Sequence, residues 1–181
     1  MIYVFLAQGF EEIEAVTTID ILRRAGYGVK TVGIGSSDVT GSHGICIKAD
    51  IGFDGVEFDK IEAIVLPGGQ PGTENLYESE QVRSCIAYCI EKNLTVCAIC
   101  AAPTVLGRLG YLEGKKAVCY PGCEDQLLGA QILNRERVCI DGNIVTGRGP
   151  GCTIDFALAI IDVLFGGKLD SITIKAGLQC S

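Results

Sequence analysis

The sequence contains a single histidine, no membrane-length apolar run and no cluster of basic residues. Its 15 lysine and arginine residues are scattered among 22 acidic residues, and the formal net charge is −7, so the basic footprint of a nucleic-acid-binding protein is missing. The longest apolar stretch near the C-terminus, residues 156–165, is about half the ~20 residues that span a bilayer, and it contains Asp162. We therefore expect neither a nucleic acid nor a membrane as partner.

The first residues also lack the basic segment of a secretory signal, and residues 1–7 read as a first strand. Ten cysteines are then better explained as small buried side chains in a reducing cytoplasm than as a disulfide framework. Cys97 and Cys100 have ligand-like spacing, as do Cys119 and Cys123, but side chains three apart on a strand point to opposite faces. We expect no metal and no cofactor.

Continuous apolar runs alternate with helical patterns along the chain. Runs such as residues 63–66 are typical of parallel strands buried on both faces, whereas the spacing within residues 79–92 indicates an amphipathic helix. Strands are predicted at residues 2–7, 28–34, 45–49, 63–66, 95–99, 115–120, 138–140, 143–146 and 171–176. Helices are predicted at residues 11–25, 79–92 and 124–129, after Cys100, and from Pro150 to a stop at Gly166 and Gly167. With no linker or repeat, residues 1–181 are expected to form one three-layer α/β domain around a mostly parallel sheet.

The helix over residues 11–25 has apolar residues at Ile13, Val16, Ile19 and Leu22, which we expect to form its stripe. Three glutamates open the helix, and carboxylates in a first turn complement the helix dipole. One of these carboxyls, when protonated, could instead donate a hydrogen bond to a nearby thiolate.

Cys100 follows a buried strand and stands just before Pro103, which suits the first turn of the next helix. The dipole of that helix should favour a thiolate at Cys100. Ligands collect at the carboxyl ends of parallel strands, where residues 8–14, 67–72 and 100–103 should meet. The glycine loop and the amide of Ala101 could form an oxyanion hole there.

A histidine-based catalytic triad lacks its obvious base, which only His43, folding back or from another subunit, could supply. No histidine follows Cys100, whose neighbour is Ala101, and the only histidine, His43, lies in a turn-rich segment over residues 36–50. As a lone loop residue, His43 is expected to be non-catalytic within its own chain.

Four motifs occur in order, at residues 9–14, 66–69, 98–103 and 146–151. Together they resemble the ThiJ/PfpI superfamily, specifically the branch of the parkinsonism-associated protein DJ-one. The resemblance covers essentially the whole chain. It implies a flavodoxin-like homodimer with Cys100 on a nucleophile elbow. The resemblance also implies that Glu12 is the family's protonated glutamate and that the amides of Gly69 and Ala101 stabilise an oxyanion.

The sequence departs from the family pattern at three places. Ala101 replaces the histidine of the protease-like branch, and Tyr120 replaces a histidine of the DJ-one branch. His43 corresponds to an arginine that approaches the site of the partner subunit, which makes it a candidate substrate contact. Arg24 and Arg148 match basic family positions near the dimer interface.

The resemblance implies a cofactor-free glyoxalase or deglycase that acts on small reactive carbonyl compounds, α-oxoaldehydes or their adducts, with Cys100 as nucleophile and Glu12 as acid and base. Gly68, Gly69, Ala101, Arg148 and His43 would complete the site. One alternative is a redox-responsive protective protein or chaperone in which Cys100 is oxidised. An intracellular protease or amidase is disfavoured because the base is missing.

Overall fold

The computed structural model describes residues 1–165 and 168–179. The predicted helix stop at Gly166 and Gly167 lies outside these residues. The strands are β1 (Ile2–Leu6), β2 (Val29–Gly33), β3 (Asp38–Thr40), β4 (Cys46–Lys48), β5 (Ile51–Gly52), β6 (Ala63–Leu66), β7 (Thr95–Ile99), β8 (Lys116–Ala117), β9 (Gln131–Ile132), β10 (Val138–Asp141) and β11 (Ile144–Gly147). The α-helices are α1 (Glu12–Arg24), α2 (Gly72–Glu78), α3 (Glu80–Glu91), α4 (Pro103–Arg108), α5 (Thr153–Phe165) and α6 (Lys168–Gly177).

Within the described residues, seven strands form the central sheet in the order β10-β11-β7-β6-β1-β2-β5. All neighbours are parallel except β10, which pairs antiparallel with β11 through the predicted hairpin. The central strands β1, β6 and β7 are buried at every position, as their unbroken apolar sequences predict. The mostly parallel sheet is therefore confirmed.

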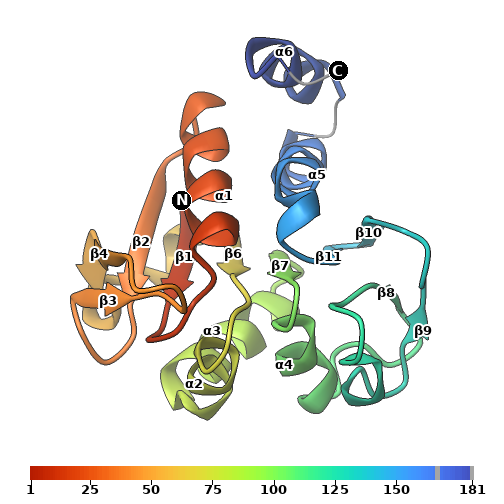
Figure 1. Cartoon of the computed structure of the whole chain (residues 1–181), viewed down its shortest axis with the longest axis horizontal. Coiled ribbons are helices and arrows are strands. Elements are labelled where there is room, and N and C mark those ends of the chain that lie inside the picture. The colour runs from red at the N-terminus through yellow and green to blue at the C-terminus, as the bar shows by residue number, and fades with distance from the viewer. Residues whose placement is uncertain (166–167, 180–181) are drawn as a thin grey trace.

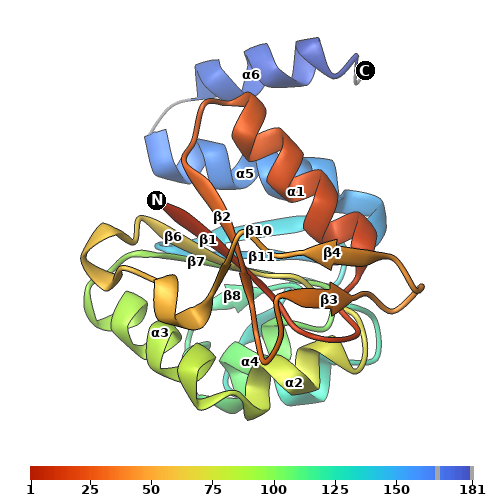
Figure 2. The ribbon, with the colours of Figure 1, turned by 90° about the vertical axis from the view of Figure 1, so that its left-hand side faces the viewer.

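Helices cover both faces of this sheet, as Figures 1 and 2 show. One hydrophobic core lies between the sheet and the pair α1 and α5, and a second lies between the opposite face and helices α2, α3 and α4. The amphipathic pattern of α3 is confirmed, with Val82, Cys85, Ile86 and Cys89 buried. The three-layer α/β fold follows.

Parallel connections bring the carboxyl ends of β1, β6 and β7 to one edge of the sheet. The segments that follow them are the start of α1, the loop 67–71 and the turn at Cys100. The fold thus assembles the three junctions that the sequence predicts to meet.

One predicted element is wrong, and another is shorter than predicted. Residues 171–176 belong to helix α6 rather than to a strand, because Ile174 and Leu178, one helical turn apart, pack against the core beside α5. Residues 124–129 contain only a short 3₁₀ turn at Glu124–Gln126. The alternation of apolar and polar residues near the C-terminus is overridden by packing on α5.

The apolar face of α1 is also rotated from the predicted stripe. Ile13 and Val16 are 55% and 47% exposed, whereas Glu12, Glu14, Thr18 and Ile21 are buried with Ile19 and Leu22. This rotation turns acidic side chains of the first helical turn into the protein.

Candidate functional site

Cys100 lies on a sharp turn directly after β7, with a φ of 65°. Its amide donates to the carbonyl of Gly147 at the end of β11 (2.9 Å), and its carbonyl accepts from the amide of Tyr120 (2.7 Å). A non-glycine residue in the left-handed region is strained, and these two backbone bonds hold it there. The predicted nucleophile elbow is present, and the cysteine on it is only 8% exposed.

The carboxyl beside Cys100 is that of Glu14, not the predicted Glu12. The amide of Gly68 donates to Glu14 Oε2 (2.7 Å), and the Glu14 carboxyl hydrogen-bonds the Cys100 thiol. The prediction of Glu12 is therefore wrong. Residues two apart on a helix are separated by about 200° around its axis and lie on nearly opposite faces, so only one of them can face the thiol.

Gly68 fits into the narrow space between these two side chains. A Cβ on Gly68 would stand 2.6 Å from Cys100 Cβ and 2.8 Å from Glu14 Oε2. Any side chain at this position would therefore push the thiol and the carboxyl apart. The glycine of the loop is needed for the approach of the two groups rather than only for a turn.

The backbone amides of Gly69 and Ala101 both interact with the Cys100 sulfur and lower its pKa. Gly69 adopts a φ of 89°, which favours glycine, and Ala101 opens the turn that leads into α4. These are the two donors that the sequence predicts at the site.

Burial dominates the electrostatics of the pair. It raises the pKa of Glu14 to about 7, although the Cys100 thiol and the Gly68 amide partly oppose the shift. Burial also raises the pKa of Cys100, and the Glu14 carboxylate raises it further. The expectation of a lowered thiol pKa is therefore wrong, because desolvation and a neighbouring negative charge outweigh the two amides. The two groups are coupled: near neutral pH Glu14 exchanges its proton, and its ionisation raises the pKa of the thiol.

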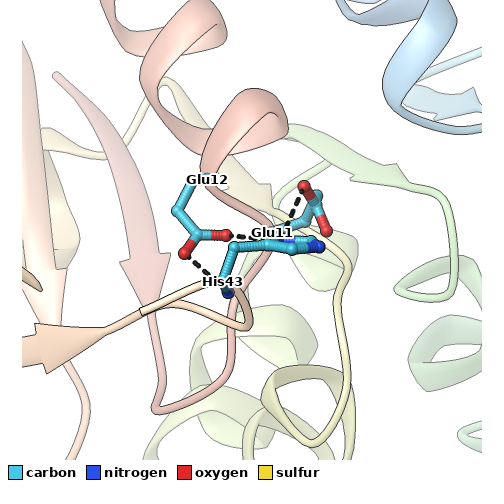
Figure 3. Close-up of side chains that lie close together, drawn as sticks. All are labelled: Glu11, Glu12 and His43. Carbon is cyan, nitrogen blue, oxygen red and sulfur yellow. Dashed lines mark hydrogen bonds and ion pairs between the residues drawn. The ribbon is translucent and has the colours of Figure 1, made fainter. Parts of the chain in front are cut away.

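Glu12 points to the opposite side of α1, toward the loop 41–45 (Figure 3). Its Oε1 accepts from the amides of His43 (2.8 Å) and Ile45 (3.2 Å), and its Oε2 lies 3.1 Å from His43 Nδ1. Burial alone would raise the pKa of Glu12, but these bonds and one from its own amide lower it to about 2. Glu12 is thus an ionised anchor for the loop.

The remaining predicted residues do not meet at the thiol within one chain. His43 is exposed and lies with Glu11 and Glu12, while Arg24 forms an ion pair with Asp20 on the surface of α1. Arg148 donates to the carbonyl of Asn134 and lines a separate cavity of about 220 Å³ that also includes Tyr120 and Arg137.

Glu14 is the residue at the thiol that the sequence pattern does not predict. Its burial could have been read from the spacing of Glu14, Thr18 and Ile21 on one helical face, had the stripe not been assigned to Ile13 and Val16. The motif over residues 9–14 does lie beside the thiol, but the predicted orientation of helix α1 about its axis is wrong.

A buried cysteine on a nucleophile elbow, paired with a carboxyl on a flavodoxin-like α/β fold, defines a class of cysteine-centred α/β proteins. The DJ-1/PfpI family model matches residues 1–163. The chain therefore belongs to the DJ-1/PfpI family.

Relatives and solved structures agree with this assignment. The chain is 38% identical to the protein dj-1beta of Drosophila melanogaster, over 90% of this chain and 88% of that protein. It is 33% identical to the deglycase PfpI of Pyrococcus furiosus, over 80% of this chain and 87% of that protein. It spans only 37% of the DJ-1 homologue B of Arabidopsis thaliana, to which it is 39% identical.

Among solved structures, that of oxidised DJ-1 from Toxoplasma gondii has a TM-score of 0.92 and 38% identity, over 98% of this chain and 97% of that one. The structure of Drosophila melanogaster DJ-1beta has a TM-score of 0.93 and 35% identity, over 99% and 97% of the two chains. The flavodoxin-like fold of the family is thus confirmed. No helix among residues 1–165 and 168–179 has the length and apolar character needed to cross a membrane.

Proposed function

We propose that this protein is a cofactor-independent cysteine enzyme of the glyoxalase or deglycase type, acting on α-oxoaldehydes or their adducts. The observation that carries the proposal is the buried Glu14 carboxyl held against the Cys100 thiol by the Gly68 amide. The relative named deglycase PfpI supports the reaction class.

For methylglyoxal, the Cys100 sulfur adds to the aldehyde carbon and gives a hemithioacetal, with the aldehyde oxygen taking the proton. Glu14 then removes the hydrogen from that carbon as a proton and returns it to the neighbouring ketone carbon. The hydroxyl proton of the hemithioacetal passes to the ketone oxygen, and the product is a thioester of lactate. Water hydrolyses the thioester and releases lactate and the thiol. No external oxidant is required, because the aldehyde carbon is oxidised while the ketone carbon is reduced.

The amides of Gly69 and Ala101 would stabilise the oxyanions that develop in these steps. A carboxyl with a pKa near 7 suits both halves of the proton transfer, since it can accept and donate a proton at neutral pH. Glu14 thus takes the acid and base role for which the sequence suggested Glu12.

The test is lactate formation from methylglyoxal by the wild type and by Cys100→Ala, Glu14→Gln and Glu12→Gln. We expect Cys100→Ala to be inactive and Glu14→Gln to lose roughly 10²- to 10⁴-fold in kcat, as for the removal of a general acid and base. Glu12→Gln should stay within about tenfold of the wild type, because Glu12 faces the loop 41–45. Equal rates for the wild type and Cys100→Ala would overturn the proposal.

A second role, oxidation of Cys100 as part of a redox response or a chaperone function, is favoured by the oxidised form of the Toxoplasma gondii relative. Mild peroxide treatment followed by peptide mass analysis should then modify Cys100 before the exposed Cys46. Modification of Cys46 alone would argue against it. A protease or amidase gains no support, since His43 lies with Glu11 and Glu12.

We also propose that the chain forms a homodimer in a reducing compartment. Ile13 and Val16 on α1 and Ile154 on α5 are exposed apolar side chains on neighbouring helices, and all nine described cysteines are free. Light scattering after gel filtration should give twice the chain mass for the wild type. A monomeric wild type would contradict the proposal, and Val16→Asp should weaken the dimer.

A further inference from the structure

Three side chains outside the Cys100 site converge at the start of α1. Glu11 is the residue just before α1, Glu12 is the first residue of that helix, and His43 comes from the loop 41–45, about thirty residues later in the chain (Figure 3). One donor atom from each of them lies within 4.8 Å of the other two. This is a mixed nitrogen and oxygen donor set contributed by two separate segments.

We propose that Glu11, Glu12 and His43 bind a divalent first-row transition metal ion of the Zn²⁺ type. An imidazole nitrogen with two carboxylate oxygens suits such an ion, whereas Mg²⁺ and Ca²⁺ prefer oxygen ligands alone. Three protein ligands leave room for water, as in open zinc sites.

The spacing of the donor atoms fits one ion. Two ligands that each lie about 2.1 Å from a metal ion stand about 3.0 Å apart in an octahedron and about 3.4 Å apart in a tetrahedron. His43 Nδ1 lies 3.1 Å from Glu12 Oε2 and 3.6 Å from Glu11 Oε1. Small rotations of these side chains are enough to place all three atoms around one ion.

The charge of the cluster also calls for a cation. In residues 1–165 and 168–179, neither Glu11 nor Glu12 has a lysine or arginine within 4.0 Å, and His43 is their only ion-pair partner. The N-terminus of α1 supplies roughly half a positive charge, and the neutral imidazole that can bind a metal supplies none, which leaves most of the two negative charges of the carboxylates unbalanced. A divalent ion would complete this balance.

The support around the donors is already in place. The amides of His43 and Ile45 hold Glu12 Oε1 and so fix Oε2 toward the imidazole. A Cβ on Gly41 would stand 2.3 Å from Glu12 Cδ, so glycine leaves the space in which this carboxylate sits. Hydrogen bonds that orient ligands in this way are a regular part of metal sites.

Zn²⁺ binding to the full chain can be followed at one residue, because the sequence has a single histidine. The metal-free protein, labelled with ¹⁵N, is titrated with zinc chloride while the imidazole nitrogens are observed by NMR. We expect the Nδ1 resonance of His43 to shift and saturate at one equivalent per chain. An Nδ1 resonance that does not respond to excess Zn²⁺ would overturn the proposal.

Calorimetry on variants separates this site from the cysteines. His43→Ala and Glu11→Gln should each weaken the binding of one Zn²⁺ by at least about tenfold. Glu80→Gln is the matched control, since Glu80 lies in the first turn of α3 without a histidine partner, and it should bind as the wild type does. With Co²⁺, this site should give no thiolate charge-transfer band. Unchanged affinity in both His43→Ala and Glu11→Gln would show that zinc binds elsewhere and would refute the site.

Discussion

Glu12 and Glu14 stand two residues apart in the first turn of the same helix, and both are buried, yet their pKa values shift in opposite directions. Burial raises the pKa of each carboxyl. Glu12 receives amides from the loop 41–45 and an imidazole, which bring its pKa down to about 2. Glu14 receives one amide and a thiol, so its pKa remains raised at about 7. Glu14 lies deeper in the protein and receives fewer hydrogen-bond donors, and the two differences together decide which carboxyl can carry a proton at neutral pH.

The largest test of this contrast is the pH dependence of stability. The folded state holds the Glu14 proton more tightly than the unfolded state, where the pKa is near 4.5, so stability falls as pH rises from 4.5 to above 7. Relative to Glu14→Gln, the wild type should lose up to about 3 kcal/mol of unfolding free energy over this range.

Glu12 should show the opposite behaviour. Its stabilising contribution is present above pH 4.5 and is lost as pH falls toward 2, so Glu12→Gln should differ in pH dependence from the wild type only on the acid side. Urea unfolding at fixed pH values measures both variants. If the unfolding free energies of the wild type and Glu14→Gln depend on pH in the same way, the raised pKa of Glu14 is contradicted.

A second test changes the space between the thiol and the carboxyl. Gly68→Ala places a Cβ 2.6 Å from Cys100 Cβ and 2.9 Å from the carbonyl oxygen of Ile99, and should cost about 2 kcal/mol of unfolding free energy through overpacking. Gly52→Ala is the control, because a Cβ there meets nothing within 4 Å. Similar urea midpoints for the two variants would contradict the close packing of Cys100 and Glu14 around Gly68.

A third test measures the coupling between Glu14 and Cys100 through the alkylation rate of the thiol. In the wild type, the rate of Cys100 alkylation by iodoacetamide should rise with pH up to about 7 and then level off, because ionisation of Glu14 raises the pKa of the thiol. In Glu14→Gln, the rate should continue to rise above pH 7. Mass spectrometry of the Cys100 peptide provides the rates, and identical profiles would exclude coupling.

The sequence was sufficient for the sheet and the elbow, because these depend on local patterns. An unbroken apolar run such as β6 indicates a strand buried on both faces, and Cys100 before Pro103 indicates a turn into a helix. The rotation of α1 depends instead on its packing against α5, because its sequence carries two competing helical spacings and no local pattern decides between them. The resemblance to the family implies Glu12 where Glu14 faces the thiol, and the helical spacing predicts Ile13 on the apolar stripe where it is exposed. The amides that ionise Glu12 come from a loop thirty residues away, a contact that spacing within the helix cannot predict.

The smallest expected effect separates the imidazole of His43 from its backbone amide. The side chain is 70% exposed, and its ion pair with Glu12 is therefore screened by water, so His43→Ala should leave the unfolding free energy almost unchanged. The variant keeps the backbone amide that donates to Glu12 Oε1, and so keeps most of the hydrogen bonding that lowers the pKa of this carboxylate. Protonation of Glu12, followed by NMR of its carboxyl carbon, should still occur well below the pH of an ordinary glutamate in His43→Ala. A Glu12 carboxyl that titrates normally in this variant would mean that the exposed imidazole, and not the loop backbone, sets the difference between the two glutamates.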